Sequence, residues 1–201
     1  MLTQIPSPRA SGPDPGRPLA RPLARILAFA VDYLVIAVYM ASIAGIGFAL
    51  RRTPSQEKFA RLWTSPRSGQ RTGFLTLTLP VVLYFAFLEG SPQGATVGKR
   101  VLGLRVVAEG NQPLPLRRSL VRSAAKFLPW ELAHTCLWRI PGWPVAPEPL
   151  SFTIWTGFAL VAALVTLYLG SLWSRLHQTL YDRLAGSYVI QNEHSQAERA
   201  V

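Results

Sequence analysis

The sequence predicts an all-α integral membrane protein, a bundle of three to four transmembrane helices with a small cytoplasmic element that contains strands. Three long apolar runs, Ile26–Leu50, Thr72–Leu88 and Leu150–Ser174, contain a single charged residue between them. The basic residues are instead concentrated in the segments between these runs. This grouping is typical of a multi-pass membrane protein, whereas an amphipathic globular protein spreads its charges periodically along its helices.

The ends of the chain differ in composition from the region between them. Residues 1–23 contain six prolines and several arginines, a composition that predicts a disordered cytosolic arm. Residues 192–201 form a polar C-terminal tail. We therefore expect the folded transmembrane domain to comprise residues 24–191.

The first apolar run contains a carboxylate at membrane depth. Its 25 residues rise about 37 Å as a helix, enough to cross a hydrocarbon core of about 30 Å. Asp32 lies inside this run, where a charge costs at least ~2.5 kcal/mol, and Arg25 stands at its entrance. Asp32 must therefore be paired, be protonated or have a function that offsets this cost. Two interpretations are open: a hydrogen-bonding anchor between helices, or a proton or cation site.

The faces of this first helix indicate how Asp32 is sheltered. A helical wheel aligns Arg25 and Asp32 on one face, together with Ala28, Ile36 and Tyr39. A stripe of small residues at spacing four lies elsewhere on the helix and would admit a second helix backbone: Ala37, Ala41, Gly45 and Ala49. We therefore expect protein on more than one side of this helix.

Pro80 interrupts the second run and removes the helical hydrogen bond to the carbonyl of Thr76. We expect a kink, with the hydroxyl groups of Thr76 and Thr78 compensating locally, although broken helices also line ion paths in transporters. Glu89 follows the run, where it can reach the membrane interface.

The segment 116–140 is ambiguous because it is partly apolar but carries seven titratable residues. It can be an interfacial amphipathic helix, a re-entrant segment, or a fourth span shielded by the other three. Basic residues favour a cytoplasmic N-terminus: four lie in 1–25 and seven in 90–126, against six in 51–71. We favour four crossings, with both termini inside.

Two short segments are rich in β-branched residues and predict strands. They are Val101–Val107, which ends before the turn signal at residues 109–111, and Ser187–Gln191, which follows Gly186. Because both follow membrane segments, we expect them to pair in a small cytoplasmic cap.

Several function classes are disfavoured. The net charge of +11 suggests nucleic acid, but the basic residues lie between apolar runs, where anionic lipid headgroups hold them, so no nucleic acid partner is expected. Cys136 is the single cysteine and cannot form an intramolecular disulfide. Residues 94–100 (GATVGKR) lack the spacing of a phosphate-binding loop and precede a predicted strand. No catalytic residue set, metal site or cofactor is expected, because HQTLYDRLAGS lacks a ligand set and no serine has a nucleophile-elbow setting.

Three pieces of the chain together resemble the RDD family of bacterial and archaeal membrane proteins. They are Arg25 with Asp32, the segment GATVGKRVLGLRVVAEGNQPLPLRRSLVR, and the closing HQTLYDRLAGSYVIQ, in which Asp182 corresponds to the second aspartate. The chain departs from the family pattern at Tyr181, where histidine is common, and at Ser187, where threonine is usual. The resemblance implies a bacterial cytoplasmic (inner) membrane location and suggests transport, of the cation/proton antiport type reported for some members.

Two hypotheses for function follow. In the first, a proton-coupled cation or small-solute transporter, Asp32 exchanges ions, Arg25 sets its pKa, and Asp182 with Arg183 forms a cytoplasmic gate or anchor. In the second, a non-transporting scaffold or accessory subunit, Arg25, Asp32 and Asp182 are structural. Five secondary candidate residues follow the second and third runs: Glu89, Lys99, Arg100, His177 and Arg183. Three or four helices enclose little interior space. We therefore expect a homo-oligomer or a membrane partner protein, in addition to contacts with the lipid bilayer.

Overall fold

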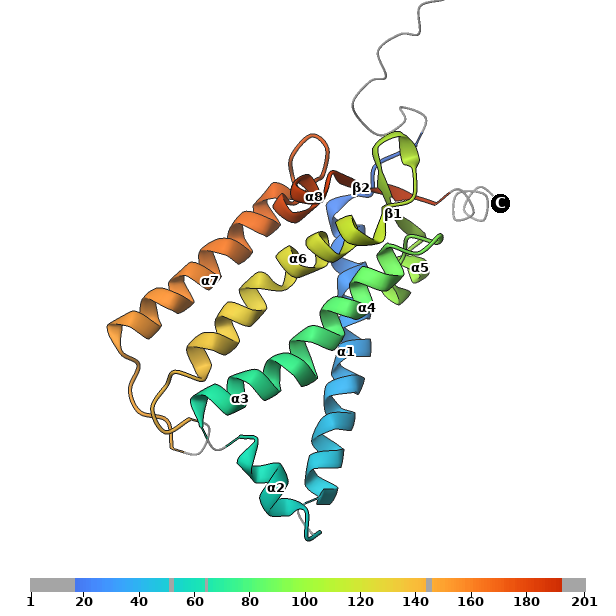
Figure 1. Ribbon diagram of the computed structural model, residues 1–201. Coiled ribbons are helices and arrows are strands. Elements are labelled where there is room, and N and C mark those ends of the chain that lie inside the picture. Colours follow the sequence, from blue (N-terminus) through green and yellow to red (C-terminus); the bar gives the residue numbers. More distant parts are fainter. Residues whose placement is uncertain (1–16, 51–52, 64, 144–145, 193–201) are drawn as a thin grey trace, which may run out of the picture.

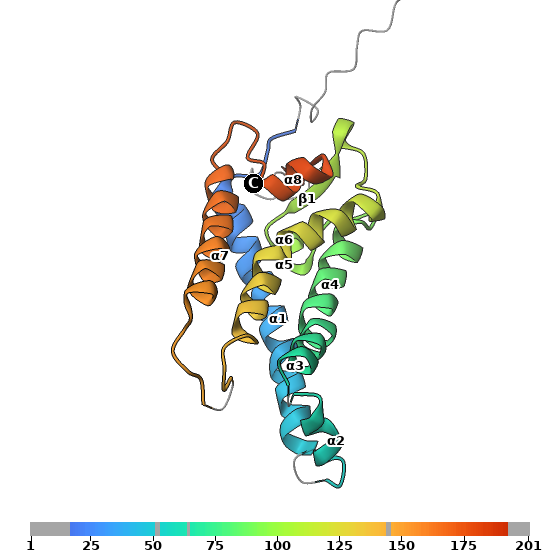
Figure 2. The same cartoon turned by 60° about the vertical axis from the view of Figure 1, so that its left-hand side comes forward.

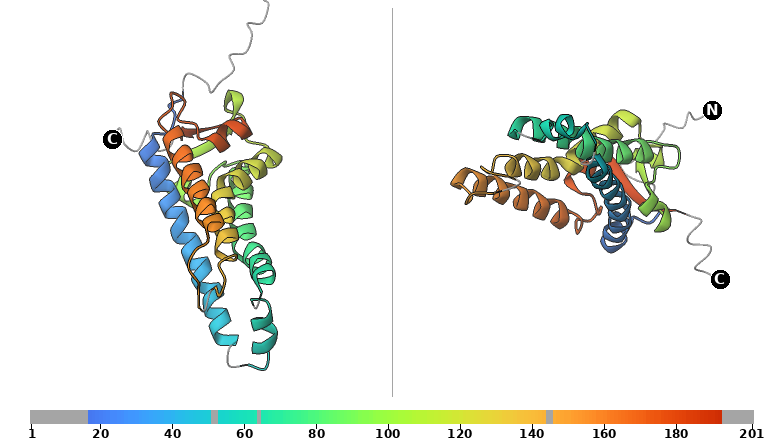
Figure 3. Two further views of the ribbon diagram at one scale, coloured as in Figure 1. Left: turned by 90° about the vertical axis from the view of Figure 1, so that its left-hand side faces the viewer. Right: turned by 90° about the horizontal axis from the view of Figure 1, so that it is seen from below.

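The computed structural model describes residues 17–50, 53–63, 65–143 and 146–192. Within them, four long helical segments alternate in direction between two ends of the molecule (Figure 1). They are α1 (Pro22–Leu50), a composite segment 66–89, α6 (Leu116–Leu137) and α7 (Phe152–Ser171). The composite segment consists of α3 (Pro66–Gly73), a π-helical stretch η1 (Phe74–Thr78) and α4 (Leu79–Glu89). The short helix α2 (Gln56–Arg61) lies beside the last turns of α1, at the end far from the strands (Figure 2 and Figure 3).

The three apolar runs of the sequence are helices, as predicted. In the described residues, three helices are long and apolar enough to cross a membrane: Pro22–Leu50, Pro66–Glu89 and Phe152–Ser171, of 29, 24 and 20 residues. The second begins six residues earlier than the apolar run, because Ser65 caps its first turn and Pro66 stands at the first helical position. The prediction of a mostly helical fold with a small strand element is therefore confirmed.

The ambiguous segment forms α6, which lies between α4 and α7 (Figure 1). The hydroxyl of Ser119 donates to the carbonyl of Ala86 in α4 at 2.8 Å, and Tyr168 in α7 donates to the carbonyl of Ala125 at 2.8 Å. Helix α6 therefore packs on a long helix on each of two sides. Because of its charged residues, α6 is not apolar enough to count as a candidate membrane span. Most of these charged side chains point into the fold.

The helical segment continues through Pro80 without a break. The threonine hydroxyls do not compensate for the hydrogen bond that the proline removes, which corrects the prediction. Thr76 Oγ1 donates to the carbonyl of Thr72 and Thr78 Oγ1 donates to Glu131, each at 2.7 Å. The carbonyl of Thr76, which Pro80 cannot bond, instead accepts from the hydroxyl of Tyr39 at 2.6 Å. The carbonyl that Pro80 leaves free thus accepts a hydrogen bond from the neighbouring helix α1.

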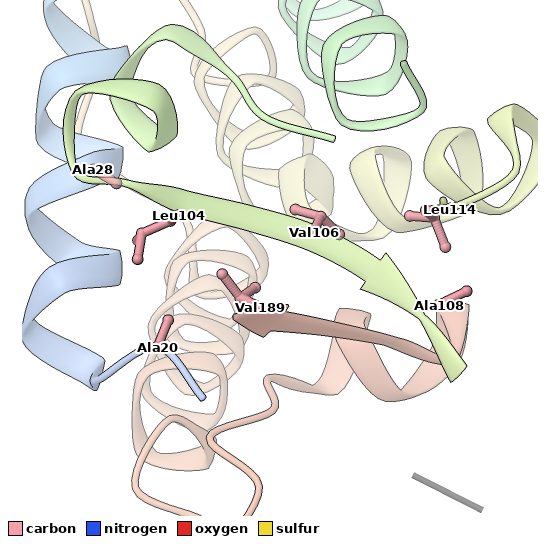
Figure 4. Packing of buried hydrophobic residues seen from close by; sticks show 7 residues of the cluster. All are labelled: Ala20, Ala28, Leu104, Val106, Ala108, Leu114 and Val189. Carbon is pink, nitrogen blue, oxygen red and sulfur yellow. The ribbon is translucent and has the colours of Figure 1, made fainter. Parts of the chain in front are cut away.

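The two predicted strands pair, as expected. Strand β1 (Leu104–Ala108) is antiparallel to β2 (Ser187–Gln191), with Leu104 opposite Gln191 and Ala108 opposite Ser187. A buried apolar cluster packs around the sheet and joins it to α1 (Figure 4): Ala20, Ala28, Leu104, Val106, Ala108, Leu114 and Val189. The prediction that β1 begins at Val101 is wrong, because Val97–Val101 form a short helix, α5, capped by the Thr96 side chain. Residues 97–100 therefore lie in this helix, and strand β1 follows it at Leu104.

The described part of the N-terminal arm belongs to the fold. The backbone N–H of Ala20 donates to the carbonyl of Val189 at 2.9 Å, Leu19 forms a bridge with Ile190, and α1 begins at Pro22. Residues 18–23, which were assigned to the arm, therefore contact the sheet or begin α1. Residues 1–16 and 193–201, where the rest of the arm and most of the polar tail were placed, lie outside the described residues.

The stripe of small residues on α1 faces away from the described chain. Ala37, Ala41, Gly45 and Ala49 are all exposed, and no atom lies within 4 Å of a Cβ built on Gly45. The expectation that this stripe shelters Asp32 is therefore wrong within the chain. The opposite face, with Ala28, Asp32 and Ile36, is the buried face, as predicted.

Candidate functional site: a buried charge network

Asp32 is fully buried and its carboxylate is occupied by hydrogen-bond donors from α4 and the start of α5. Oδ1 accepts from the hydroxyl of Tyr84 at 2.9 Å and from the backbone N–H of Gly98 at 2.8 Å. Oδ2 accepts from the hydroxyl of Thr96 at 2.6 Å. No described lysine, arginine or histidine forms a salt bridge with it. Asp32 therefore anchors the loop after α4 to the middle of α1.

This anchoring requires glycine at position 98. A Cβ atom built there would collide with the carbonyl oxygen of Ala28 and lie 2.9 Å from Cγ of Asp32. Only a residue without a side chain lets the α5 backbone approach α1 closely enough for the N–H to reach the carboxylate. Gly98 therefore belongs to the site, although sequence reasoning treated it only as part of a rejected phosphate-binding motif.

Asp182 is the second buried carboxylate, and local sequence sets its position. It is the third residue of α8 (Leu180–Ala185), where Thr179 and Asp182 form a capping box: Asp182 Oδ2 accepts from the Thr179 N–H at 3.0 Å and from its hydroxyl at 2.7 Å. The same carboxylate accepts from Arg25 at 2.6 Å and from Nε and Nη2 of Arg122 at 2.9 and 2.6 Å. It thus joins α1, α6 and α8.

Arg25 pairs with Asp182 and not with Asp32, which corrects the expectation that it sets the pKa of Asp32. Its Nη2 donates to Asp182, and its Nη1 donates to the carbonyl of His177. His177 has a left-handed backbone (φ 46°), and its Nδ1 lies 2.9 Å from the carbonyl of Leu172. Arg25 therefore fastens the turn between α7 and α8 to the first turn of α1.

Glu89 is fully buried, so the expectation that it reaches the membrane interface is wrong. Oε1 accepts from Lys99 Nζ at 2.7 Å, and Oε2 is paired with Nη1 of Arg122. Lys126 Nζ lies 3.9 Å from Oε1. Arg122 is 1% exposed and bridges the two carboxylates, Glu89 of α4 and Asp182 of α8.

The remaining secondary candidates lie outside this network. Arg100 is exposed and its Nε donates to the carbonyl of Ala95 at 3.1 Å. Arg183 is also exposed, and no described carboxylate pairs with it. The proposed partnership of Asp182 with Arg183 is therefore replaced by partnerships with Arg25 and Arg122.

Sequence reasoning missed Arg122 and Lys126 as site residues. Both were counted only as loop-side positive charges, yet the spacing of Arg118, Arg122 and Lys126 at four residues places them on one helix face. Arg118 also points into the fold, where its guanidinium donates to the carbonyls of Ala185 and Gly186 at the end of α8. This basic stripe was the available signal for an inward-facing cationic surface.

The charge partners of Asp182 govern its protonation. Burial alone would raise the pKa of this carboxyl, but the guanidinium groups of Arg122 and Arg25 outweigh it and hold the pKa well below its usual range. A depressed pKa stabilises the fold at pH values above the ordinary aspartate pKa of about 3.9, and this stabilisation is lost as pH falls toward the folded-state value.

We therefore expect the stability difference between wild type and an Asp182→Asn variant to depend on pH. At pH 7 the variant should be less stable by roughly 3 kcal/mol, the cost of removing one partner of a buried ion pair. The difference should shrink as pH is lowered below about 4. Thermal unfolding in mild detergent between pH 3 and 7 measures it, and parallel curves for the two proteins would contradict the assigned charge state.

The network fixes α1, α4, α6 and α8 to one another. Buried carboxylates held by arginines and lysines among long apolar helices fit a membrane protein whose polar groups are satisfied internally. The chain belongs to the RDD family, whose model matches residues 19–186. No curated protein and no solved structure matches the chain.

Proposed function

We propose that the chain is a four-crossing protein of the bacterial cytoplasmic membrane, acting as a non-transporting, non-enzymatic scaffold or accessory subunit. Helix α6 is the fourth crossing, since its direction alternates with those of its neighbours (Figure 1). The basic residues at the sheet end support a cytoplasmic location for that end and for both termini. The burial of Arg122 and its pairing with two carboxylates support a crossing by α6, because they satisfy the charge within the protein.

The observation that carries the scaffold role is the sealed environment of Asp32. Its side chain is 0% exposed and accepts three hydrogen bonds from Tyr84, Thr96 and Gly98. A carboxylate that exchanges protons or cations needs access to water during its cycle. Asp32 and Asp182 instead each join elements that are distant in sequence, which is the geometry of structural anchors.

The exposed faces of the bundle support association with a second membrane protein or another copy. Apart from Ala28, Asp32 and Ile36, the residues of α1 are at least partly exposed, and α7 buries only Ile154 against the described chain. Native mass spectrometry after mild-detergent extraction tests this part of the proposal. Detection of the monomer alone, without a stable partner or a second copy, would count against it.

Ion flux in proteoliposomes tests the scaffold role against transport. With an imposed pH gradient and added monovalent cations, wild type and Asp32→Asn should dissipate the gradient equally slowly. The variant should nevertheless lose roughly 1–3 kcal/mol of stability, because an amide cannot accept all three hydrogen bonds. Flux in wild type that a folded Asp32→Asn protein lacks would overturn the scaffold role in favour of transport.

A small-solute transporter is the second candidate, favoured by one observation. A cavity of about 390 Å³ lies between α1, α6 and α7 and is lined by Arg25, Lys99, Arg122 and Lys126. Its positive lining supports an anionic rather than a cationic solute. The same flux experiment with anions in place of cations tests this candidate.

A further inference from the structure

The cavity between α1, α6 and α7 has an unequal distribution of charge. Among the described residues, four cationic side chains line it and no aspartate or glutamate does. The carboxylates that balance them, Glu89 and Asp182, lie behind the lining and are already engaged by Lys99, Arg25 and Arg122. Even with Asp32 included, four cations face three carboxylates, which leaves one positive charge in excess.

Among the four described cations of the lining, Lys126 lies farthest from its carboxylate partner. Its side chain is 9% exposed, its Nζ is 3.9 Å from Glu89, and no described residue forms a hydrogen bond with it. The ammonium instead lies 3.6 Å from the ring centroid of Phe85. A buried ammonium that lacks hydrogen-bond acceptors is costly, so this position favours a bound anion.

The cavity is also graded in polarity along the bundle. Arg25 is in the first turn of α1, Arg122 in the second turn of α6, and Lys99 is in α5, all at the sheet end. Further from the sheet the lining is apolar, with Trp130 and Ala133 of α6 and Val161 of α7. This order, cations at the membrane surface and apolar side chains deeper, matches a lipid in the leaflet at the sheet end.

The cavity also has a route of entry from the bilayer. Helices α1 and α7 both line it, but among the described residues they do not pack closely along each other, whereas α6 packs closely on α7. The volume of about 390 Å³ lies within the range of roughly 300–1,000 Å³ that is usual for small-molecule sites. An amphiphile can therefore enter sideways between α1 and α7.

We propose that this cavity binds an anionic phospholipid. The phosphate accepts hydrogen bonds from Lys126 and the neighbouring guanidinium groups, and an acyl chain lies against Val161 and Val165 of α7. This is a built site within the helix bundle, distinct from the general attraction of basic loops to headgroups. It holds whether the protein is a scaffold or a transporter, because binding alone is inferred.

Lipid titration followed by native mass spectrometry tests the proposal on the full chain in mild detergent. The probes are phosphatidylglycerol, phosphatidylcholine with the same acyl chains, and inorganic phosphate. Wild type should bind phosphatidylglycerol at least about tenfold more tightly than phosphatidylcholine, equivalent to about 1.4 kcal/mol. Equal binding of the two lipids, or binding of inorganic phosphate without a preference for phosphatidylglycerol, would overturn a lipid as the ligand.

Two matched pairs of variants locate the site. Lys126→Gln should bring the two lipids within about twofold of each other, whereas Arg117→Gln, on an exposed position of the same helix, should keep the preference. Val165→Trp should fill the cavity and weaken phosphatidylglycerol binding, whereas Leu167→Trp, which lies on α7 outside the lining, should not. The tryptophan pair keeps the test decisive if Lys126→Gln fails to fold.

A purely structural Lys126 gives a different result. If the ammonium serves only Glu89, Lys126→Gln lowers the thermal midpoint and leaves the ratio of the two lipid affinities unchanged. That outcome, or an equal loss of preference in Arg117→Gln, would overturn the proposed site.

Discussion

An Arg122→Met variant should lose roughly 3–5 kcal/mol of stability, a large fraction of the roughly 5–15 kcal/mol that is usual for a folded protein. The side chain is 1% exposed and its guanidinium is shared between Asp182 and Glu89. Methionine fills a similar volume but leaves both carboxylates with one cationic partner fewer in a medium that cannot solvate them. Glu89 would retain Lys99, and Asp182 would retain Arg25.

Two measurements in mild detergent detect this loss. Size-exclusion chromatography gives the yield of monodisperse protein, and thermal unfolding gives its midpoint. Arg117→Met removes the same charge from an exposed position of the same helix and should change stability by less than about 0.5 kcal/mol. If Arg122→Met and Arg117→Met behave alike, Arg122 does not bridge the two carboxylates.

Gly98→Ala should have the second largest effect, a loss of about 3 kcal/mol, because a single methyl group would separate α5 from α1. The added Cβ meets the backbone carbonyl of Ala28, which cannot move aside as a flexible side chain can. Separation also removes the hydrogen bond from the Gly98 N–H to Asp32 and leaves the buried carboxylate short of a donor.

Gly45→Ala is the matched control. Gly45 is also in a helix, and a Cβ there meets nothing within 4 Å. Alanine should therefore raise stability by up to about 1 kcal/mol through helix propensity in an otherwise identical experiment. Equal thermal midpoints for the two alanine variants would show that the close approach of α5 to α1 is not required.

The apolar helices were predictable from the sequence because their signal is local. An uncharged run of sufficient length specifies a helix regardless of what surrounds it, and β-branched segments beside glycines specified the strands. The first residue of β1 was misplaced because Val97 and Val101 resemble strand residues, whereas Thr96 caps a short helix there. Capping by a single threonine was the competing local signal.

The pairing of charges could not be predicted because it depends on contacts between distant parts of the chain. Arg25 and Asp32 share a helix face, yet Arg25 reaches Asp182, 157 residues away, while Asp32 receives only uncharged donors. Helix geometry indicates which residues share a face but not which neighbouring element covers that face. The inward orientation of Arg122 likewise follows from the packing of α6 between α4 and α7.

The long sequence separation of these pairs has a consequence for biosynthesis. Asp182 follows Arg122 by 60 residues, and at a synthesis rate of roughly 5–20 residues per second it emerges roughly 3–12 s later. During that interval Arg122 has Glu89 but lacks its second carboxylate, and Arg25 waits longer still. Arg25 and Arg122 therefore reach their final pairing only some time after α6 has been translated. The charge network is completed only when α8 has been translated, so α8, the last helix of the described residues, supplies the carboxylate that pairs with Arg25 of α1.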